Sequence, residues 1–278
     1  MQENPFLKLD FPFSGIIYTM SLNKRNSMNN LYKFTGKAEI YSKYRPSYPD
    51  AFLDELFEYI RPVRESVLVE IGSGTGILTE ALLKRHNCVI AVEPNEDMRS
   101  VAEQRLAGYP GFVSHTGTAE HTLLEEHCAD LVIAAQAFHW FDPDAFREEC
   151  RRILKPGAPV VLVWNMRDRT APIILENAEI CRRYCPDFHG FSGNNITDEL
   201  IVPFFRPGTC RIREFENPQY FDRESFIGRN LSSSYAPVAG SEGRDAFTAD
   251  LAELFDRMQD GNGKILIRHV TRCYFGMV

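Results

Sequence analysis

Three glycines alternate with small hydroxyl residues at Gly72, Gly74 and Gly76, directly after the apolar segment 67–71. Because glycine has no Cβ, such a run lets the chain turn tightly and lets a ligand approach the backbone. In dinucleotide enzymes a loop of this kind holds a pyrophosphate, with the spacing G-x-G-x-x-G. Here the third glycine comes one residue earlier, and Glu70 stands just before the loop. A carboxylate there would repel a pyrophosphate but could accept a hydrogen bond from an ammonium group.

The carboxylate of Glu93 follows the next apolar segment, 88–92. Its spacing from Gly72 is that at which an acidic residue can accept both hydroxyls of a ribose. Alone, Glu93 could be a surface carboxylate, but together with the glycine loop it favours an adenosine-containing ligand. Pro94 then turns the chain, and Met98 falls where it either contacts that ligand or packs in a helix core.

Short apolar segments alternate with amphipathic ones over residues 51–164. Strands are predicted at 67–71, 88–92, 111–115, 130–135 and 159–164, and helices at 51–60, 77–84, 95–108 and 142–155. Asn95 and Asp142 are typical N-cap residues, and Pro143 suits a first helical turn. Strands separated by helices predict βαβ units, and therefore a mostly parallel sheet with helices on both faces.

The pattern changes after residue 164. Segments 209–221 and 265–275 alternate like strands, 244–258 has a helical pattern, and 166–207 is rich in proline and glycine. The stretch 166–235 is therefore predicted to be a cap over the active site and not an independent domain. Its aromatic residues would line a partly apolar acceptor pocket or, equally, form a core of their own.

These motifs resemble those of class I S-adenosylmethionine-dependent methyltransferases, and among them the small-molecule group that includes trans-aconitate methyltransferase-like proteins. The resemblance extends over most of residues 34–278, which would form the methyltransferase domain. It rests on the stretches FTGKAEIYSKYRP (34–46), VEIGSGTG (69–76), VEPN (92–95), AQAFHWF (135–141) and LSSSY (231–235). It implies an α/β fold: a Rossmann-like, doubly wound sheet of seven mostly parallel strands with an antiparallel edge strand and a helical cap insertion. Segments 209–221 and 265–275 are the candidates for the last two strands.

The resemblance also implies which residues would hold the cofactor, S-adenosyl-L-methionine. The glycine loop would surround the methionine part, with Glu70 supporting it directly or through water, and Glu93 would hold the ribose. The loop residues are Gly72, Ser73, Gly74, Thr75 and Gly76. Pro94 and Met98 would adjoin the same ligand.

The remaining cofactor contacts would come from three further segments. Thr118, Ala119 and Glu120 would lie beside the adenine, while Gln136 and Ala137 would line the pocket after the strand 130–135. Tyr41 and Arg45 would close over the cofactor, where Arg45 is placed either to bind its carboxylate or to form a surface salt bridge. These residues complete the predicted cofactor site.

His139 is the candidate catalytic residue, because it follows the strand 130–135 at the edge of the predicted site. Methyl transfer from a sulfonium is a direct displacement, so the protein must mainly align the acceptor and exclude water. A base is needed only if the acceptor is protonated, and histidine titrates near neutrality. Alternatively, His139 and Trp140 form only the wall of the pocket.

Two other functions remain open on the sequence: a cofactor-binding protein without catalysis, and an NAD-dependent oxidoreductase. The glycine spacing and Glu70 argue against the second. No metal site is expected, because no compact cluster of carboxylates or histidines is present. Cys181, Cys185 and His189 are spaced by four, but Pro186 would break a helix that carried them.

The chain has 278 residues, a formal net charge of -7 and no long basic run, which favours a small-molecule acceptor over nucleic acid. No stretch reaches the apolar length of a membrane span, and the first residues do not resemble a signal peptide. Seven irregularly spaced cysteines indicate free thiols in a reducing, cytoplasmic location. Residues 1–33 are predicted to be a poorly ordered extension, with the working protein beginning near Met28. The sequence does not define the oligomeric state.

Overall fold

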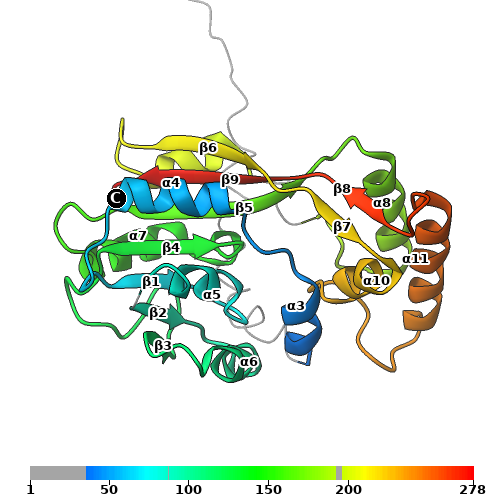
Figure 1. Cartoon of the computed structure of the whole chain (residues 1–278), viewed down its shortest axis with the longest axis horizontal. Coiled ribbons are helices and arrows are strands. Elements are labelled where there is room, and N and C mark those ends of the chain that lie inside the picture. The colour runs from blue at the N-terminus through cyan, green and yellow to red at the C-terminus, as the bar shows by residue number, and fades with distance from the viewer. Residues whose placement is uncertain (1–35, 87, 192–195) are drawn as a thin grey trace, which may run out of the picture.

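The computed structural model describes residues 36–86, 88–191 and 196–278 (Figure 1), so the predicted extension 1–33 lies outside the described residues. Its main feature is a seven-stranded sheet with the strand order β3-β2-β1-β4-β5-β9-β6. The strands are β1 (Leu68–Ile71), β2 (Val89–Val92), β3 (Phe112–His115), β4 (Leu131–Ala135), β5 (Val160–Arg167), β6 (Arg211–Glu216) and β9 (His269–Gly276).

The first five strands pair in parallel, whereas β9 runs antiparallel to both β5 and the edge strand β6. Every residue of the central strands β1 and β4 is buried. Such continuous apolar strands are typical of a parallel sheet that helices cover on both faces. The predicted Rossmann-like fold class is therefore confirmed, with the antiparallel strand placed toward one edge of the sheet.

One face of the sheet is covered by α4 (Asp50–Ile60), α5 (Ile77–Leu83) and α6 (Glu96–Leu106). Phe52 and Leu56 of α4 pack with strand residues such as Leu68 and Ile133, and all four are fully buried. The helices α4 and α5, which precede and follow β1 in the chain, thereby hold this strand in place. The glycine loop begins at the carboxyl end of β1.

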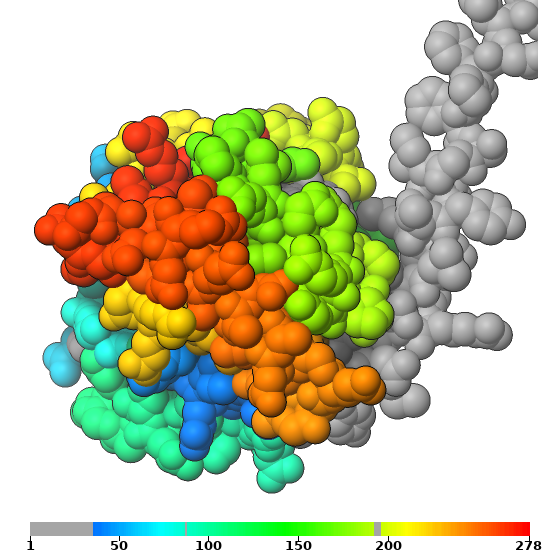
Figure 2. Space-filling view, turned by 90° about the vertical axis from the view of Figure 1, so that its right-hand side faces the viewer, coloured from blue at the N-terminus to red at the C-terminus, as the bar shows by residue number. Residues whose placement is uncertain are grey.

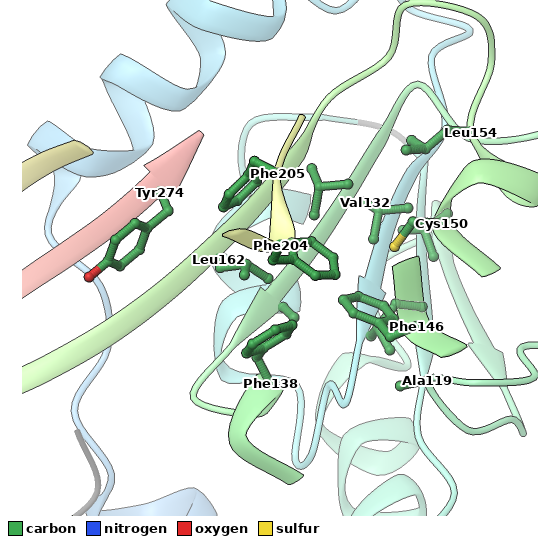
Figure 3. Close-up of a cluster of buried hydrophobic side chains, with 14 of the residues drawn as sticks. Ala119, Val132, Phe138, Phe146, Cys150, Leu154, Leu162, Phe204, Phe205 and Tyr274 are labelled. Atoms are coloured by element: carbon green, nitrogen blue, oxygen red, sulfur yellow. The ribbon is translucent and has the colours of Figure 1, made fainter. Parts of the chain in front are cut away.

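The other face carries α7 (Pro143–Ile153), the short helix α9 (Asp198–Ile201) and the 3-10 turns η2 (Phe138–Trp140) and η3 (Val202–Phe204). Side chains that alternate with those of the first face, such as Val132 and Leu162, point into this second core (Figure 3). Phe138 lies edge-on to Phe204, with 4.9 Å between ring centroids, and Phe146 stacks on Phe204 at 5.5 Å. This aromatic packing anchors η2 and, with it, the segment that follows β4.

Each of the segments 209–221 and 265–275, whose patterns indicated one strand apiece, is divided in the structure. β6 and β9 are indeed the last two strands of the main sheet, but β7 (Gln219–Phe221) and β8 (Ile265–Ile267) pair separately as a two-stranded antiparallel sheet. Pro218, between β6 and β7, has no N–H to donate to a strand ladder. A break at this place is therefore consistent with the chemistry of the chain.

The small sheet belongs to a second packed unit, which we call the outer unit: α8 (Pro172–Tyr184), β7, α10 (Arg223–Leu231), α11 (Arg244–Met258) and β8. Its buried apolar residues, including Ile174, Phe226 and Leu251, form one core. Figure 2 looks onto this unit, with α8 in green and α11 in orange. The stretch 166–235 contributes α8, β7 and α10 to it, but also supplies β6, α9 and η3 to the main fold, while α11 and β8 come from beyond that stretch.

Candidate active site

The glycine loop joins β1 to α5 at the carboxyl edge of the sheet, with positive φ angles at Gly72 (69°), Gly74 (57°) and Gly76 (75°). A Cβ on Gly72 would lie 2.7 Å from the Cβ of Ala137, and one on Gly76 would lie 2.7 Å from Leu106. A Cβ on Gly74 would meet no atom within 4 Å. Gly72 and Gly76 are therefore required for packing, whereas Gly74 faces open space beside the loop.

Glu93, at the end of β2, is buried and faces the same space. One carboxylate oxygen accepts the backbone N–H of Gly74 (2.9 Å), and the other accepts that of Asn95 (2.9 Å). Burial raises the pKa of Glu93, while these two hydrogen bonds act in the opposite direction. The carboxylate is thus fixed in orientation and still has lone pairs for a hydroxyl-bearing ligand.

Glu70, the last but one residue of β1, is almost completely buried and accepts a hydrogen bond from the hydroxyl of Thr79 (2.6 Å). Burial raises the pKa of Glu70 to about 8, and the neighbouring Glu93 adds to the rise. A positive charge placed beside this group would favour its ionised form and lower this pKa. An ammonium group beside the loop fits this carboxyl, whereas a pyrophosphate does not.

One cavity brings together almost all of the predicted cofactor residues, and Thr75 and Gly76 are the exceptions. The predicted residues that line it are Tyr41, Arg45, Glu70, Gly72, Ser73, Gly74, Glu93, Pro94, Met98, Thr118, Ala119, Glu120, Gln136 and Ala137. Thr75 is buried under the loop, and Gly76 packs against α6. The segments chosen from the sequence therefore converge on one place in the fold.

The segment after β4 enters the cavity in a strained conformation. Gln136 has a φ of 57°, which is uncommon for a residue with a side chain. Its N–H donates to Val163 (2.8 Å), and its side chain donates to the carbonyl of Asn165 (3.4 Å). Such strain persists only where the surroundings impose it, and it is often found at functional sites. The next residue, Ala137, lies against Gly72 of the glycine loop.

His139 lies in a small neighbouring pocket and not in the main cavity. The two pockets share four lining residues: Tyr41, Arg45, Gln136 and Trp140. The imidazole of His139 also lies beside the Trp140 ring, with 4.8 Å between centroids. His139 is therefore at the edge of the site, as the sequence predicts.

Tyr41 and Arg45 come from the segment around α3 (Ala38–Tyr44), which lies beside α10 (Figure 1). The guanidinium of Arg45 lies over the Tyr41 ring at 4.5 Å and donates to the hydroxyl and carbonyl oxygens of Ser232, both at 3.1 Å. Lys37 donates to the carbonyls of Ser233 (2.9 Å) and Ala236 (2.8 Å). The segment 231–236 thus connects the residues around α3, which line the cavity, to the outer unit by hydrogen bonds.

Several cavity residues had no role in the sequence interpretation, notably Tyr48, Asn165 and Arg229. Asn165 accepts hydrogen bonds from Thr271 (2.6 Å) and Asn217 (3.2 Å), so its place depends on β9 and on the chain after β6. Arg229 is on α10 of the outer unit. The sequence hinted at a role for Arg229 in one way: it is a charged residue between Phe226 and Leu231, just before the LSSSY stretch (231–235).

Comparison with known proteins agrees with this geometry. The family described as methyltransferase domain matches residues 69–162. An uncharacterized methyltransferase of Mycobacterium tuberculosis is 31% identical over 237 residues, which cover 84% of this chain and 90% of that protein. An uncharacterized methyltransferase-like protein of Schizosaccharomyces pombe is 34% identical over 152 residues, covering 54% of this chain and 58% of that protein. The chain belongs to the class I S-adenosylmethionine-dependent methyltransferases.

A solved structure from Anaeromyxobacter dehalogenans, provisionally assigned as a type II methyltransferase, is similar to this fold. Its TM-score is 0.60 at 25% sequence identity, over 84% of this chain and 98% of that chain. The similarity extends well beyond the matched residues 69–162 into the carboxyl-terminal half.

Two further findings concern other kinds of site. In residues 36–86, 88–191 and 196–278, no group of three or more His, Cys, Asp or Glu side chains is arranged to hold a metal ion. Over the same ranges, none of the helices has both the length and the apolar character needed to cross a bilayer.

Proposed function

We propose that this protein transfers the methyl group of S-adenosyl-L-methionine to a small-molecule acceptor. The observation that carries the proposal is the single cavity that joins the glycine loop and Glu93 to the outer unit. Its lining combines the glycine loop and two buried carboxyl groups, which are typical of a site for an adenosine-containing ligand, with aromatic and basic side chains. A cavity of this kind suits a cofactor and a second small reactant side by side.

The residues around the glycine loop fit the cofactor. The open space at Gly74 leaves room for a ligand against the backbone, and Glu93 offers oriented acceptor oxygens for a ribose. Glu70 would face the ammonium of the methionine part, Thr118, Ala119 and Glu120 the adenine, and Tyr41 with Arg45 would cover the ligand. When bound, S-adenosyl-L-methionine supplies a methyl group on a positively charged sulfur. Two carboxyl groups in this part of the cavity make NAD, with its pyrophosphate, the poorer fit.

The chain's own task is then to align the acceptor with that methyl group and to keep water out. Trp140, Phe141 and Tyr48 supply the rigid aromatic wall for this. We assign the outer unit, to which the stretch 166–235 contributes α8, β7 and α10, the role of a cap that selects the acceptor. His139 would position the acceptor or take its proton from the adjoining pocket. The free cysteines of the described chain agree with a cytosolic location, which is part of the proposal.

Transfer of a radiolabelled methyl group tests this function. We expect label from methyl-labelled S-adenosyl-L-methionine to enter the low-molecular-mass fraction of a cell extract, and to remain absent from the protein and RNA fractions. Label in a macromolecule would contradict the small-molecule acceptor. Tight cofactor binding without any transfer would instead indicate the non-catalytic binding protein.

Substitution of His139 by glutamine separates its two possible roles. If His139 takes a proton, the variant loses rate by about 100-fold or more, and the wild-type rate falls as the pH drops below the pKa of a histidine. If it only shapes the pocket, the acceptor KM changes while kcat and its pH profile stay the same. The acceptor found by radiolabelling is the substrate for this measurement.

A further inference from the structure

The guanidinium of Arg229 is a buried cation in the wall of the cavity. The residue is 8% exposed and lines the cavity from α10. Within the part of the chain that the structure describes, neither its Nε nor its Nη1 finds a hydrogen-bond acceptor. Arginine is rarely buried in this way, because a buried charge is normally paired.

The surroundings of Arg229 are themselves basic. Burial lowers the pKa of Arg229 well below its ordinary value, and the positive charges of Arg45 and Arg167 add to this effect. The guanidinium of Arg167 lies over the ring of Phe191 at 4.5 Å, and burial lowers its pKa as well. Among the described residues, no ion pair involves any of these three arginines. Three cations thus gather without a carboxylate.

His269 on β9 is a further titratable group that interacts electrostatically with Arg167 and Arg229. Its side chain is buried, and burial lowers its pKa to about 3. The positive charges of Arg167 and Arg229 add to this lowering. The histidine is therefore neutral at physiological pH and does not add a fourth cation. It offers no negative charge to Arg229 either, whereas a bound anion would supply one.

An anion in the cavity would satisfy this cluster. An arginine guanidinium presents a planar fork of donors that matches the two oxygens of a carboxylate or a phosphate. Arg229 is one of the residues that line the cavity, so a ligand bound there can reach its side chain. A buried charge without a partner is destabilising, and an oxyanion would remove that penalty on binding.

The positions of Arg167 and Arg229 associate them with the acceptor, whereas Arg45 is also a predicted cofactor contact. Of the predicted cofactor contacts, the glycine loop follows β1 and Glu93 follows β2, whereas Arg167 ends β5. In the sheet β5 is separated from β1 by β4. Arg229 lines the cavity from α10 of the outer unit, whereas the glycine loop belongs to the main fold.

We infer that the methyl acceptor carries an oxyanion, a carboxylate or a phosphate, which Arg229 binds inside the cavity with support from Arg45 and Arg167. The inference rests on the proposed methyl transfer, because it assigns the anion to the acceptor. It makes Arg229 a residue that determines acceptor specificity. The same chemistry could be supplied by the carboxylate of the cofactor, so the test must distinguish the two sources.

The test measures the unfolding temperature of the protein with and without S-adenosylhomocysteine. Succinate and inorganic phosphate are added at constant ionic strength, with neutral succinamide as the matched control for succinate. The variants are Arg229→Met, which removes the charge, and Arg257→Met, which removes an exposed arginine of the outer unit that pairs with Glu176. Affinity for S-adenosylhomocysteine is measured on the same proteins by calorimetry.

We expect succinate or phosphate to raise the unfolding temperature of the wild type by about 2–4 °C more than succinamide does. Arg229→Met should lose this excess, unfold at a higher temperature than the wild type when no anion is present, and bind S-adenosylhomocysteine within about threefold of the wild type. Arg257→Met should behave as the wild type. If Arg229→Met does not fold, Arg229→Lys carries the test: it keeps the charge, loses the fork, and should show a reduced anion effect.

Three results would overturn the inference. One is an anion effect that is absent from the wild type, and a second is an anion effect that persists in Arg229→Met. The third is a loss of about tenfold or more in S-adenosylhomocysteine affinity in Arg229→Met, since it would assign the anion to the cofactor. If S-adenosylhomocysteine does not bind the wild type at all, the proposed function fails, while an Arg229-dependent anion effect would still establish the anion site.

Discussion

Replacing Gly74 by alanine should reduce the affinity for S-adenosyl-L-methionine by about 100-fold while leaving most of the stability in place. The added Cβ meets no protein atom within 4 Å, so it would project into the space proposed for the cofactor. The positive φ of 57° adds a backbone penalty of about 1–2 kcal/mol, which acts on stability and not on binding. Calorimetric titration and urea unfolding of the same samples measure the two effects separately.

Gly157→Ala is the matched control for this prediction. Gly157 has a φ of 83°, and a Cβ there would also meet nothing within 4 Å, but the residue does not line the cavity. Both variants should therefore lose similar stability, and only Gly74→Ala should lose cofactor affinity. Equal cofactor affinity in Gly74→Ala and Gly157→Ala would show that the ligand does not approach the loop.

Glu70→Gln should stabilise the protein without ligand at high pH and have little effect at pH 5. The folded-state pKa of about 8 is above the ordinary value of 4.5, so the folded state holds this proton after the unfolded chain has released it. The stability of the wild type therefore falls as the pH rises from 4.5 to 8, by on the order of 4–5 kcal/mol from this group. Glutamine does not titrate and avoids that loss.

Urea unfolding at pH 5 and pH 8.5 measures this difference. Glu58→Gln, which changes an exposed glutamate of α4, provides the control and should show no pH-dependent gain. The same Glu70→Gln protein should bind S-adenosyl-L-methionine about tenfold or more weakly, because its amide cannot carry the charge that faces the ammonium. A gain in stability that is equal at both pH values would contradict the raised pKa of Glu70.

The sequence predicted the main fold because that information is local. Apolar runs with two buried faces predict parallel strands, and the caps Asn95 and Asp142 do accept hydrogen bonds from the first turns of α6 and α7. The glycine loop and Glu93 were located for the same reason, since a strand, a turn and a carboxylate follow one another closely in the chain. The structure places both at one edge of the sheet, in agreement with a doubly wound fold.

The remainder depends on contacts between distant segments. The division of 209–221 and 265–275 reflects the pairing of β7 with β8, which no local pattern encodes. Arg229 enters the cavity only because α10 packs against α3, and Asn165 is oriented by residues from β9 and the chain after β6. Thr75 and Gly76 were predicted among the cofactor residues but do not line the cavity, for another reason. A sequence motif also includes residues that shape the loop without lining the cavity.

The most direct test of the central claim is calorimetric titration with S-adenosyl-L-methionine, S-adenosylhomocysteine and NAD. The proteins are the wild type, Glu93→Ala, and Glu103→Ala as an exposed control from α6. We expect both sulfur-containing ligands to bind the wild type and Glu103→Ala alike, to bind Glu93→Ala about 10–100-fold more weakly, and NAD not to compete. Binding of NAD alone, or undiminished binding to Glu93→Ala, would contradict the assignment of this cavity to S-adenosyl-L-methionine.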